Sequence, residues 1–366
     1  MSNSDSESPL IHTIGHRDNY GSTQFTSGTS QDDEAIDRRP NVPGFVANNA
    51  GMLYIISSQF FFACMNLSVK MLNSSDPPVH PFEVIVVRTG ITLICCVIYM
   101  IVTGVPDPIL GPKGVRTLLV IRGITGFLGL CGLYLSLQYL SVADATVLTF
   151  LTPLTTAVAG CILLKEGYSV TQAVAGFCSL LGVVLIARPP FLFNSMPAVI
   201  PDIYYLPETT PAQRLAAVGV SMIGVLGATG AYTSIRAIGK RAHPMHVMSF
   251  FSLWCTTMAS LGMVVFNIPV VYPKSWRWSL LLLMVGAFGF VAQTLLTLGL
   301  QRETVSRGST GVYIQVLFAV VLERLIFGVV PSLLSVLGAA IIVSSALFVV
   351  LTKRGPTPVN TADSTA

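Results

Sequence analysis

The sequence predicts an all-α membrane protein with ten transmembrane helices in an inverted 5+5 repeat. Three observations support this fold class. The composition is strongly apolar, ten long apolar segments follow one another, and a proline-containing linker separates two groups of five segments. Short motifs also recur in the two halves, which indicates that the halves are related.

The composition is that of a chain whose solvent is lipid. Hydrophobic residues make up 52% of the 366 residues and charged residues only 10%, whereas soluble domains carry roughly 25% charged residues. A water-soluble fold of this composition would expose large apolar patches. The net charge of +4 comes from scattered basic residues, which excludes the dense basic surface that nucleic-acid binding requires.

Each apolar segment is long enough, or nearly so, to cross roughly 30 Å of hydrocarbon as a helix. Their apolarity is continuous rather than alternating, so helices are predicted rather than the strands of a barrel. The predicted spans are Gly51–Met71, Phe82–Thr103, Thr117–Gln138, Ala143–Leu164, Val170–Ala187, Leu215–Ile235, Met245–Ile268, Ser279–Leu300, Ser309–Phe327 and Ser332–Leu351.

The spans divide the chain into five parts. Residues 1–47 are polar and are expected to form a disordered cytosolic tail. Residues 48–190 form the first repeat, 191–213 the linker loop and 214–352 the second repeat, and 353–366 form a second cytosolic tail. The first tail has no apolar core followed by a cleavage site, so the first span is expected to act as the insertion signal.

Basic residues predict the orientation. If the N-terminus is cytosolic, 13 of the 21 Lys and Arg residues lie on the cytosolic side and 6 on the other side. Cytosolic loops of membrane proteins carry an excess of Lys and Arg. Both termini are therefore predicted to be cytosolic, in the plasma membrane or an endomembrane.

Two motifs recur in the same order in both halves. Ser68-Val69-Lys70 precedes His80-Pro81, and Ser234-Ile235-Arg236 precedes His243-Pro244. An odd number of spans in each half forces the second half to insert upside down. An inverted repeat is typical of alternating-access carriers, with the substrate site between the halves near the membrane midplane.

At this point the chain resembles a known family. The runs SVADATVLTFLTPLTTAVAG at 141–160, LLKEGYS at 163–169 and AGFCSLLGVVLIARP at 175–189 resemble the EamA repeat, the unit of the drug/metabolite transporter superfamily. The sequence around 143–146, with Arg122-Gly123 before it, is most similar to eukaryotic EamA-type carriers, in the solute-carrier group that contains the nucleotide-sugar transporters. The resemblance covers roughly residues 50–351 and implies ten helices, an inverted 5+5 repeat and a central cavity.

The second half departs from the pattern of the first. Gln315 stands where the first half has Pro153, and Gly328 stands where it has Glu166. Substrates vary widely among such carriers, so the resemblance does not name the substrate of this chain.

Two arginines lie within predicted spans, Arg88 in the second and Arg122 in the third. A charge in hydrocarbon costs at least roughly 2.5–3.5 kcal/mol, which makes each a functional candidate. Snorkelling to the interface or capping of helix carbonyls would explain either residue without a function. The alternative is substrate binding, because a planar guanidinium suits a carboxylate or phosphate. Their repeat counterparts, near Phe251 and Met284, are uncharged, so the repeat itself does not require the arginines.

Further polar side chains on the spans complete the predicted substrate site. They are Asn66, Tyr134, Gln138, Gln293, Tyr313 and Gln315, with Tyr232 as a weaker candidate. Hydrogen bonding between helices is the alternative role for each of them. As a set, they predict one polar cavity lined by spans one, three, four, six, eight and nine.

Charged residues near the span ends are given interfacial roles. Lys70 lies one turn after Asn66 and is predicted to anchor the outer interface. Glu323 beside Arg324 is predicted to form a solvated interfacial pair rather than a proton-coupling site. Uniport, exchange and proton coupling therefore all stay open.

These features predict a secondary transporter, not an enzyme, that moves a small polar, anionic metabolite by alternating access. An organic acid and a nucleotide-derived metabolite are the two classes considered. A membrane-embedded receptor or scaffold, or an enzyme without transport activity, is the alternative. No cofactor, metal or nucleic acid is expected as a partner. The expected partners are a small-molecule substrate and the lipid bilayer, and a homodimer is left open.

Overall fold

The computed structural model describes residues 44–73, 79–137, 139–140, 142–167, 169–189, 192, 210–272, 275–328 and 332–352. Residues 1–43 and 353–366, and most of the linker loop, lie outside these ranges. The two predicted tails therefore lie outside the described residues, except for residues 44–47, which belong to the first helix.

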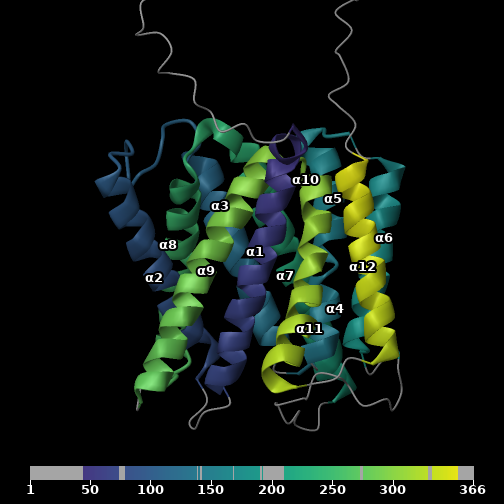
Figure 1. The fold of residues 1–366 in the computed structure, drawn as a ribbon. Helices are drawn as coiled ribbons and strands as arrows, with labels where there is room; N and C mark the ends of the chain where they lie inside the picture. The colour runs from purple at the N-terminus through teal and green to yellow at the C-terminus, as the bar shows by residue number, and fades with distance from the viewer. Residues whose placement is uncertain are drawn as a thin grey trace, which may run out of the picture. The chain divides into compact units, whose positions relative to one another are not determined.

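The regular elements of the described chain are all helices, and ten of its segments are long and apolar enough to cross a membrane. The elements are α1 (Gly44–Asn73), α2 (Pro81–Val102), α3 (Arg116–Ser136), α4 (Val142–Thr149), α5 (Thr152–Leu164), α6 (Val170–Ala187), α7 (Pro211–Ile238), η1 (Gly239–Arg241), α8 (Pro244–Val265), α9 (Trp276–Arg302), α10 (Val305–Thr310), η2 (Gly311–Tyr313), α11 (Ile314–Phe327) and α12 (Leu333–Leu351) (Figure 1). The predicted fold class is confirmed.

The helices run across the bundle in alternating directions. α1 begins at the end that carries Asn49, here called the Asn49 end, and finishes at the end that carries Lys70, here called the Lys70 end. After five crossings α7 begins at the Lys70 end, so the second half is inverted relative to the first (Figure 1). The described start of α1 and the described end of α12 therefore lie at the same end of the bundle.

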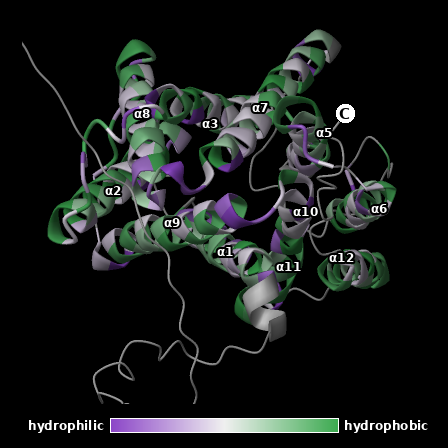
Figure 2. Ribbon diagram, turned by 90° about the horizontal axis from the view of Figure 1, so that it is seen from above, coloured by the Kyte–Doolittle hydropathy of each residue, from purple (hydrophilic) through white to green (hydrophobic). Residues whose placement is uncertain are grey.

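Each half supplies one helix to the main packed pairs. α1 packs against α9, α2 against α8, α3 against α7, and α6 against α12. The last pair lies at one edge of the bundle and the α2–α8 pair at the opposite edge (Figure 2). The two halves are therefore interlocked.

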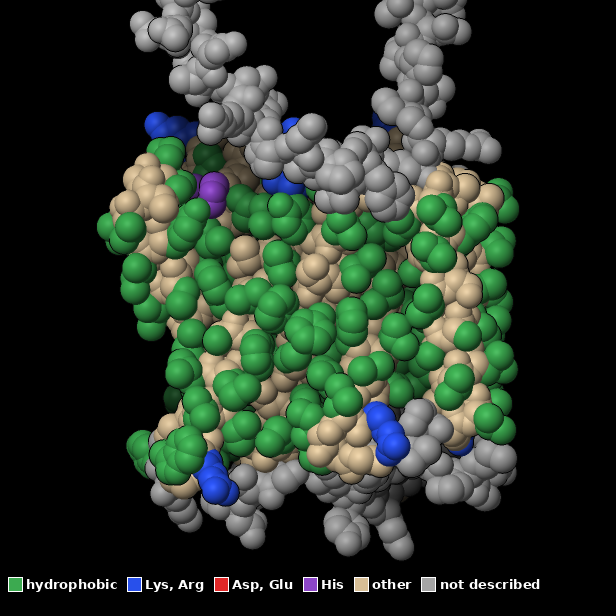
Figure 3. Space-filling model, viewed as in Figure 1, with side chains coloured by type: hydrophobic (Ala, Val, Ile, Leu, Met, Phe, Trp, Pro, Cys, Tyr) green, Lys and Arg blue, Asp and Glu red, His purple; other side chains and the backbone are tan. Residues whose placement is uncertain are grey.

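The outer surface matches a hydrocarbon environment. Apolar side chains cover the middle of the face drawn in Figure 3, and Lys and Arg lie toward its two ends. Ile98, Ile162 and Leu226 are each more than half exposed. Exposed apolar side chains at these positions fit contact with lipid rather than water.

The two halves begin their second spans with the same helix cap. His80 and His243 are the N-caps of α2 and α8, each followed by proline at the first helical position. The Nδ1 atom of each imidazole accepts a hydrogen bond from the backbone N–H two residues later, at 3.3 Å in both cases. The His-Pro motifs noted in the sequence are therefore equivalent caps at opposite ends of the bundle.

Glycines allow α3 and α7 to approach closely. A side-chain carbon added at Gly227 would lie 2.6 Å from the backbone nitrogen of Gly129 and 2.8 Å from the carbonyl oxygen of Thr125. Small residues at helix crossings are the usual means of close packing in membranes, where lipid supplies no hydrophobic drive for association. Gly219, on the same helix, meets nothing within 4 Å.

We expect Gly227→Ala to destabilise the protein and Gly219→Ala to leave it unchanged or slightly more stable. Both changes raise helix propensity equally, but only the first forces two backbones apart, at a cost of about 1–3 kcal/mol. The measurement is the thermal unfolding midpoint of each variant in detergent. Equal midpoints would show that the α3–α7 contact is not tight.

We also expect the stability to fall at acidic pH through the two histidine caps. Burial lowers the pKa of His80, and burial together with the charge of His246 lowers the pKa of His243. The folded state thus favours neutral imidazoles, so their contribution is complete above the unfolded pKa of about 6.5 and is lost as the pH falls below it. Thermal unfolding from pH 8 to pH 5 measures this loss.

The control for this prediction is the double variant His80→Asn/His243→Asn. Asparagine is a good N-cap that does not titrate. The double variant should therefore keep its stability near neutral pH and show a flatter pH dependence. An unchanged pH dependence would assign the acid sensitivity to other groups.

Candidate functional site

Two spans are broken at equivalent positions of the repeat. The fourth span consists of α4 and α5 with a turn at Phe150 and Leu151, and the ninth consists of α10, the short helix η2 and α11. Both predicted spans are present, each with an interruption, and the ninth begins at Val305 rather than at the predicted Ser309. Pro153 has no N–H to bond to the carbonyl of Thr149, so the α-helical ladder cannot run through the first break.

A cavity of about 200 Å³ lies between the two breaks. Its wall consists of Asn66, Leu133, Thr146, Thr149, Phe150, Thr152, Pro153, Ala228, Tyr232, Val312 and Gln315. Irregular backbone at membrane depth is tolerated where it is enclosed by protein or lines a cavity. Discontinuous helices of this kind form the substrate sites of many transporters built from inverted repeats.

The wall comes from spans one, three, four, six and nine, and span eight contributes no residue to it. Span eight, which is α9, was also predicted to line the cavity, but none of its residues belongs to the wall. Gln293 lies on α9 and is 8% exposed, but it is not part of the wall.

Asn66 and Gln315 are the two predicted residues that line this cavity directly, and the weaker candidate Tyr232 joins them. Thr146, Thr149 and Thr152 were missed. Their three-residue spacing in the sequence places them along one side of the fourth span, and that periodicity was the signal that could have identified them. The hydroxyl of Thr152 is buried and has no hydrogen-bond partner among the described residues.

The two broken spans touch through an aromatic pair. Tyr313 is fully buried and stacks on Phe150, with ring centroids 5.7 Å apart and an angle of 23° between the planes. Phe150 belongs to the cavity wall. Tyr313 therefore supports the wall from behind and does not line it.

Two further predicted residues lie elsewhere or cannot be placed. Tyr134 packs against an apolar cluster that includes Phe82, Phe251 and Cys255. Gln138 lies outside the described residues. The predicted set is therefore only partly gathered at one site.

Arg122 is buried beside the cavity. Its side chain is 2% exposed, and its guanidinium carbon lies 4.2 Å from the ring centroid of Phe251. The Nε and Nη1 atoms are buried without a hydrogen-bond partner among the described residues. The titratable groups close enough to interact with its charge are Tyr232, which belongs to the cavity wall, and Cys255.

Arg88 occupies a different position. Its Nη1 atom lies 3.5 Å from the sulfur of Met65 on α1, and its aliphatic chain packs on Gly289 of α9. It is half-buried and does not line the cavity.

A larger groove of about 480 Å³ lies between α5 and α7. It is lined mainly by apolar side chains, several of them exposed, such as Val158 and Ile162. Its two threonines, Thr155 and Thr229, bond to each other at 2.6 Å. We assign this groove to the lipid-facing surface because it offers a polar solute no open hydrogen-bonding group.

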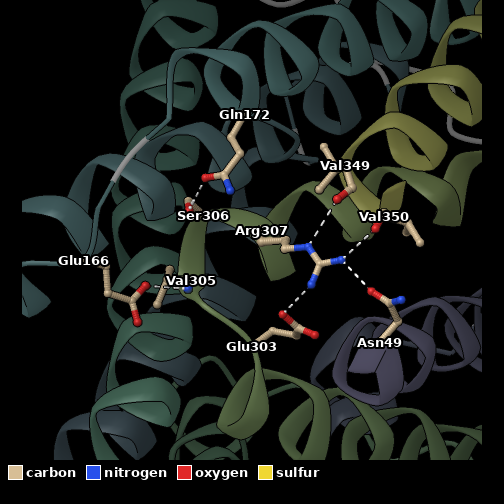
Figure 4. A network of polar contacts seen from close by, with 9 residues as sticks. All are labelled: Asn49, Glu166, Gln172, Glu303, Val305, Ser306, Arg307, Val349 and Val350. Atoms are coloured by element: carbon tan, nitrogen blue, oxygen red, sulfur yellow. Dashed lines mark hydrogen bonds and ion pairs between the residues drawn. The ribbon is translucent and has the colours of Figure 1, made fainter. Parts of the chain in front are cut away.

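The Asn49 end is held by a buried polar network centred on Arg307 (Figure 4). Its guanidinium donates to Glu303 at 2.9 Å, to Asn49 at 2.8 Å, and to the carbonyls of Val349 and Val350 at 3.2 Å each. These bonds join the starts of α1 and α10 to the last turn of α12. Arg307 is one of the 13 basic residues on the predicted cytosolic side, but it is only 4% exposed.

Glu166 extends this network toward α7. One carboxylate oxygen accepts from Arg236 at 2.7 Å, and the other accepts from the backbone N–H of Val305 at 2.7 Å. Arg236 also donates to the carbonyl of Gln301 at 3.3 Å. The end of α7 is thereby tied to the end of α5 and to the start of α10.

At the Lys70 end, Lys70 bonds to Glu323 at 2.6 Å and lies 5.0 Å from the ring centroid of Phe327. Arg324, the expected partner of Glu323, instead donates to the carbonyl of Gly328 at 2.7 Å. The predicted Glu323–Arg324 pair is therefore wrong. Helical geometry explains this, because adjacent residues point in different directions on a helix.

Comparison with known proteins identifies the same two-part organisation. The model of the EamA-like transporter family matches residues 49–188 and 203–351. A Saccharomyces cerevisiae protein described as a probable transport protein, YPL264C, is 38% identical over 84% of this chain and 90% of its own length. Solute carrier family 35 member G1 of Homo sapiens is 32% identical over 81% of this chain and 77% of its own.

A solved crystal structure supports the fold independently of close sequence similarity. It matches 83% of this chain and 98% of its own, with a TM-score of 0.66 and 18% identity. At this identity the match bears on the fold alone. The fold of this part of the chain is thus shared with an experimentally determined protein.

We expect Arg307→Gln to destabilise the bundle strongly and Arg324→Gln to have little effect. The first change removes the cationic partner of the buried Glu303 and two donors to the α12 carbonyls, and breaking a buried ion pair costs about 3–5 kcal/mol. The second removes a bond to a residue just past the end of the same helix, at an exposed position. Yield and thermal unfolding midpoint in detergent compare the two, and similar values would show that the Arg307 network is not structural.

Proposed function

Because the chain belongs to the EamA-like transporter family, we propose that it carries a small polar, anionic metabolite across a membrane by alternating access. The family and its relatives are transporters rather than enzymes, and the ten apolar helices make the chain an integral membrane protein. The proposal concerns the charge of the solute, its binding site and the way in which the site changes sides.

The main support for an anionic substrate is the burial of Arg122 without a full set of hydrogen-bond partners among the described residues. This guanidinium is buried, and two of its nitrogens have no hydrogen-bond partner among the described residues. A buried cation without a paired anion is costly. A carboxylate or phosphate that enters the cavity would offset this cost, and bidentate bonding would add selectivity.

Tyr232 connects Arg122 to the cavity. It lines the wall and lies close enough to Arg122 for the two to interact electrostatically. A solute that displaces the Tyr232 side chain, or bonds to its hydroxyl, would come within reach of the guanidinium. Arg88 packs against α1 and α9 and is not part of the wall, so we assign it the lesser part in substrate binding.

The remaining wall suits the polar part of a small solute. Asn66 and Gln315 offer amide groups from the first and ninth spans, and the buried hydroxyl of Thr152 has no partner among the described residues. Hydrogen bonds to these groups would orient the solute between the halves. The volume of about 200 Å³ is below the roughly 300–1,000 Å³ of drug-sized sites, which favours an organic acid over a nucleotide-derived metabolite.

The symmetry of the fold supports alternating access. Inverted halves can exchange conformations, so that a site between them opens first to one side of the membrane and then to the other. The distribution of basic residues in the sequence supports an orientation with both chain ends in the cytosol. The Asn49 end then faces the cytosol and the Lys70 end faces the opposite compartment.

The proposal predicts that Arg122→Gln lowers the apparent affinity for the transported anion about ten- to a hundredfold. The loss corresponds to one charge-assisted hydrogen bond of about 1.5–3 kcal/mol. Flux into proteoliposomes, measured for matched anionic and neutral solutes, tests it. Ligands for the flux assay come from a thermal-shift screen of the purified protein, because binding raises the apparent stability.

The control is Arg88→Gln, which removes an equivalent charge away from the cavity wall. We expect a smaller effect on affinity than that of Arg122→Gln. Unchanged affinity in the Arg122 variant would remove Arg122 from the binding site. Flux restricted to neutral solutes would overturn the anionic substrate altogether.

A further inference from the structure

Two ion pairs join the halves of the protein at opposite ends of the bundle. Lys70 of α1 bonds to Glu323 of α11, with 2.6 Å between Nζ and Oε1. Arg236 of α7 bonds to Glu166, just after α5, with 2.7 Å between Nε and Oε1. The four side chains are between 15% and 27% exposed, so both pairs are largely shielded.

The inverted repeat relates these two pairs. α1 and α7 are the first spans of their halves, and the ends of both carry the recurring motif, Ser68-Val69-Lys70 and Ser234-Ile235-Arg236. α5 and α11 close the fourth and ninth spans. The contact between α1 and α11 is therefore the symmetry counterpart of the contact between α7 and α5.

The acids do not occupy equivalent sequence positions. Gly328 is the counterpart of Glu166, and Glu323 lies five residues earlier. The second half thus lacks the acid at the repeat position but supplies one from the preceding helix turns. The two ends retain the ion pair although the sequence position of the acid differs.

Each basic residue lies one helical turn beyond a residue of the cavity wall. Lys70 follows Asn66 on α1, and Arg236 follows Tyr232 on α7, both at a spacing of four residues. Residues four apart lie on the same helix face. The face of α1 or α7 that contacts a solute in the cavity therefore continues directly into an ion pair at its end.

We propose that Lys70–Glu323 and Arg236–Glu166 are a pair of alternating gates, of which one breaks while the other stays formed. The inference rests on the proposed transport function. Opening the cavity toward the Lys70 end requires α1 to separate from α11, which breaks the first pair. Opening toward the Asn49 end requires α7 to separate from α5, which breaks the second. Both pairs are formed in the structure, so neither proposed gate is broken in it.

The test is thiol labelling of the cavity from each side of the membrane. Thr149→Cys places a thiol of similar size on the cavity wall. An impermeant maleimide is applied outside or trapped inside sealed proteoliposomes of fixed orientation. The labelling of the protein that keeps Thr149 is measured in the same way and subtracted as background. The readout needs no substrate, so it is independent of whether the proposed function is correct.

In this background we expect Lys70→Gln to increase labelling from the Lys70 end about fivefold relative to the other end. Arg236→Gln should shift labelling by a similar factor toward the Asn49 end. About fivefold is the shift that loss of a partly exposed ion pair produces in a two-state equilibrium. The exchanged pair Lys70→Glu/Glu323→Lys should restore the original ratio.

Two neighbouring arginines provide matched controls. Arg324 adjoins Glu323 and bonds to the carbonyl of Gly328, and Arg241 bonds to carbonyls of Ala237 and Ile238. Neither bond joins the two halves, so Arg324→Gln and Arg241→Gln should leave the ratio unchanged. If a single gate variant fails to fold, Glu323→Gln or Glu166→Gln removes the same pair from the other side.

Labelling that rises equally from both ends, or does not change in the gate variants, would overturn the proposal. A shift toward the wrong end would do so as well. A correct shift in a protein that carries none of the tested solutes would retain the gates and reject the proposed substrate. The experiment therefore distinguishes a failure of the proposed gates from a failure of the proposed substrate.

Discussion

The constraint on which the rest of the structure depends is the absence of water in the hydrocarbon layer. Backbone N–H and C=O groups in that layer must bond to each other, which leaves helices as the available form for this chain. The rule also explains where the helices are interrupted. Both breaks, at Phe150–Leu151 and at Gly311–Tyr313, lie beside the cavity, where irregular backbone is tolerated.

The same constraint governs the charged side chains. Arg307 donates hydrogen bonds to a carboxylate, a side-chain amide and two backbone carbonyls. Lys70 and Arg236 each form an ion pair with a carboxylate from the other half. Arg122 lies over the face of Phe251, and its Nε and Nη1 atoms have no hydrogen-bond partner among the described residues. Structural charges are thus distinguished from a candidate binding charge by how completely their bonds are formed.

Much of the fold could be predicted because hydrophobic length is a local property of the sequence. The ten spans and the inversion of the halves follow from segment lengths and from an odd count. The site could be predicted only in part, because contacts between distant segments decide it. Asn66 and Gln315 line the cavity, but Gln293 is not part of its wall, and Glu323 bonds to a lysine 253 residues away rather than to its neighbour. No local pattern contains that information.

The packing of each helix against a partner from the other half has a consequence for biosynthesis. α3 meets α7 through bare glycine surfaces, and α1 meets α9 in the same way at Gly299. The ribosome completes α1 more than 200 residues before it reaches the start of α9 at Trp276. α7 (Pro211–Ile238) is made during that interval and can cover the surface of α3, but α1 has no α9 neighbour at Gly299 until the interval ends. Lipid or an insertion chaperone must therefore occupy this surface of α1 until α9 is inserted.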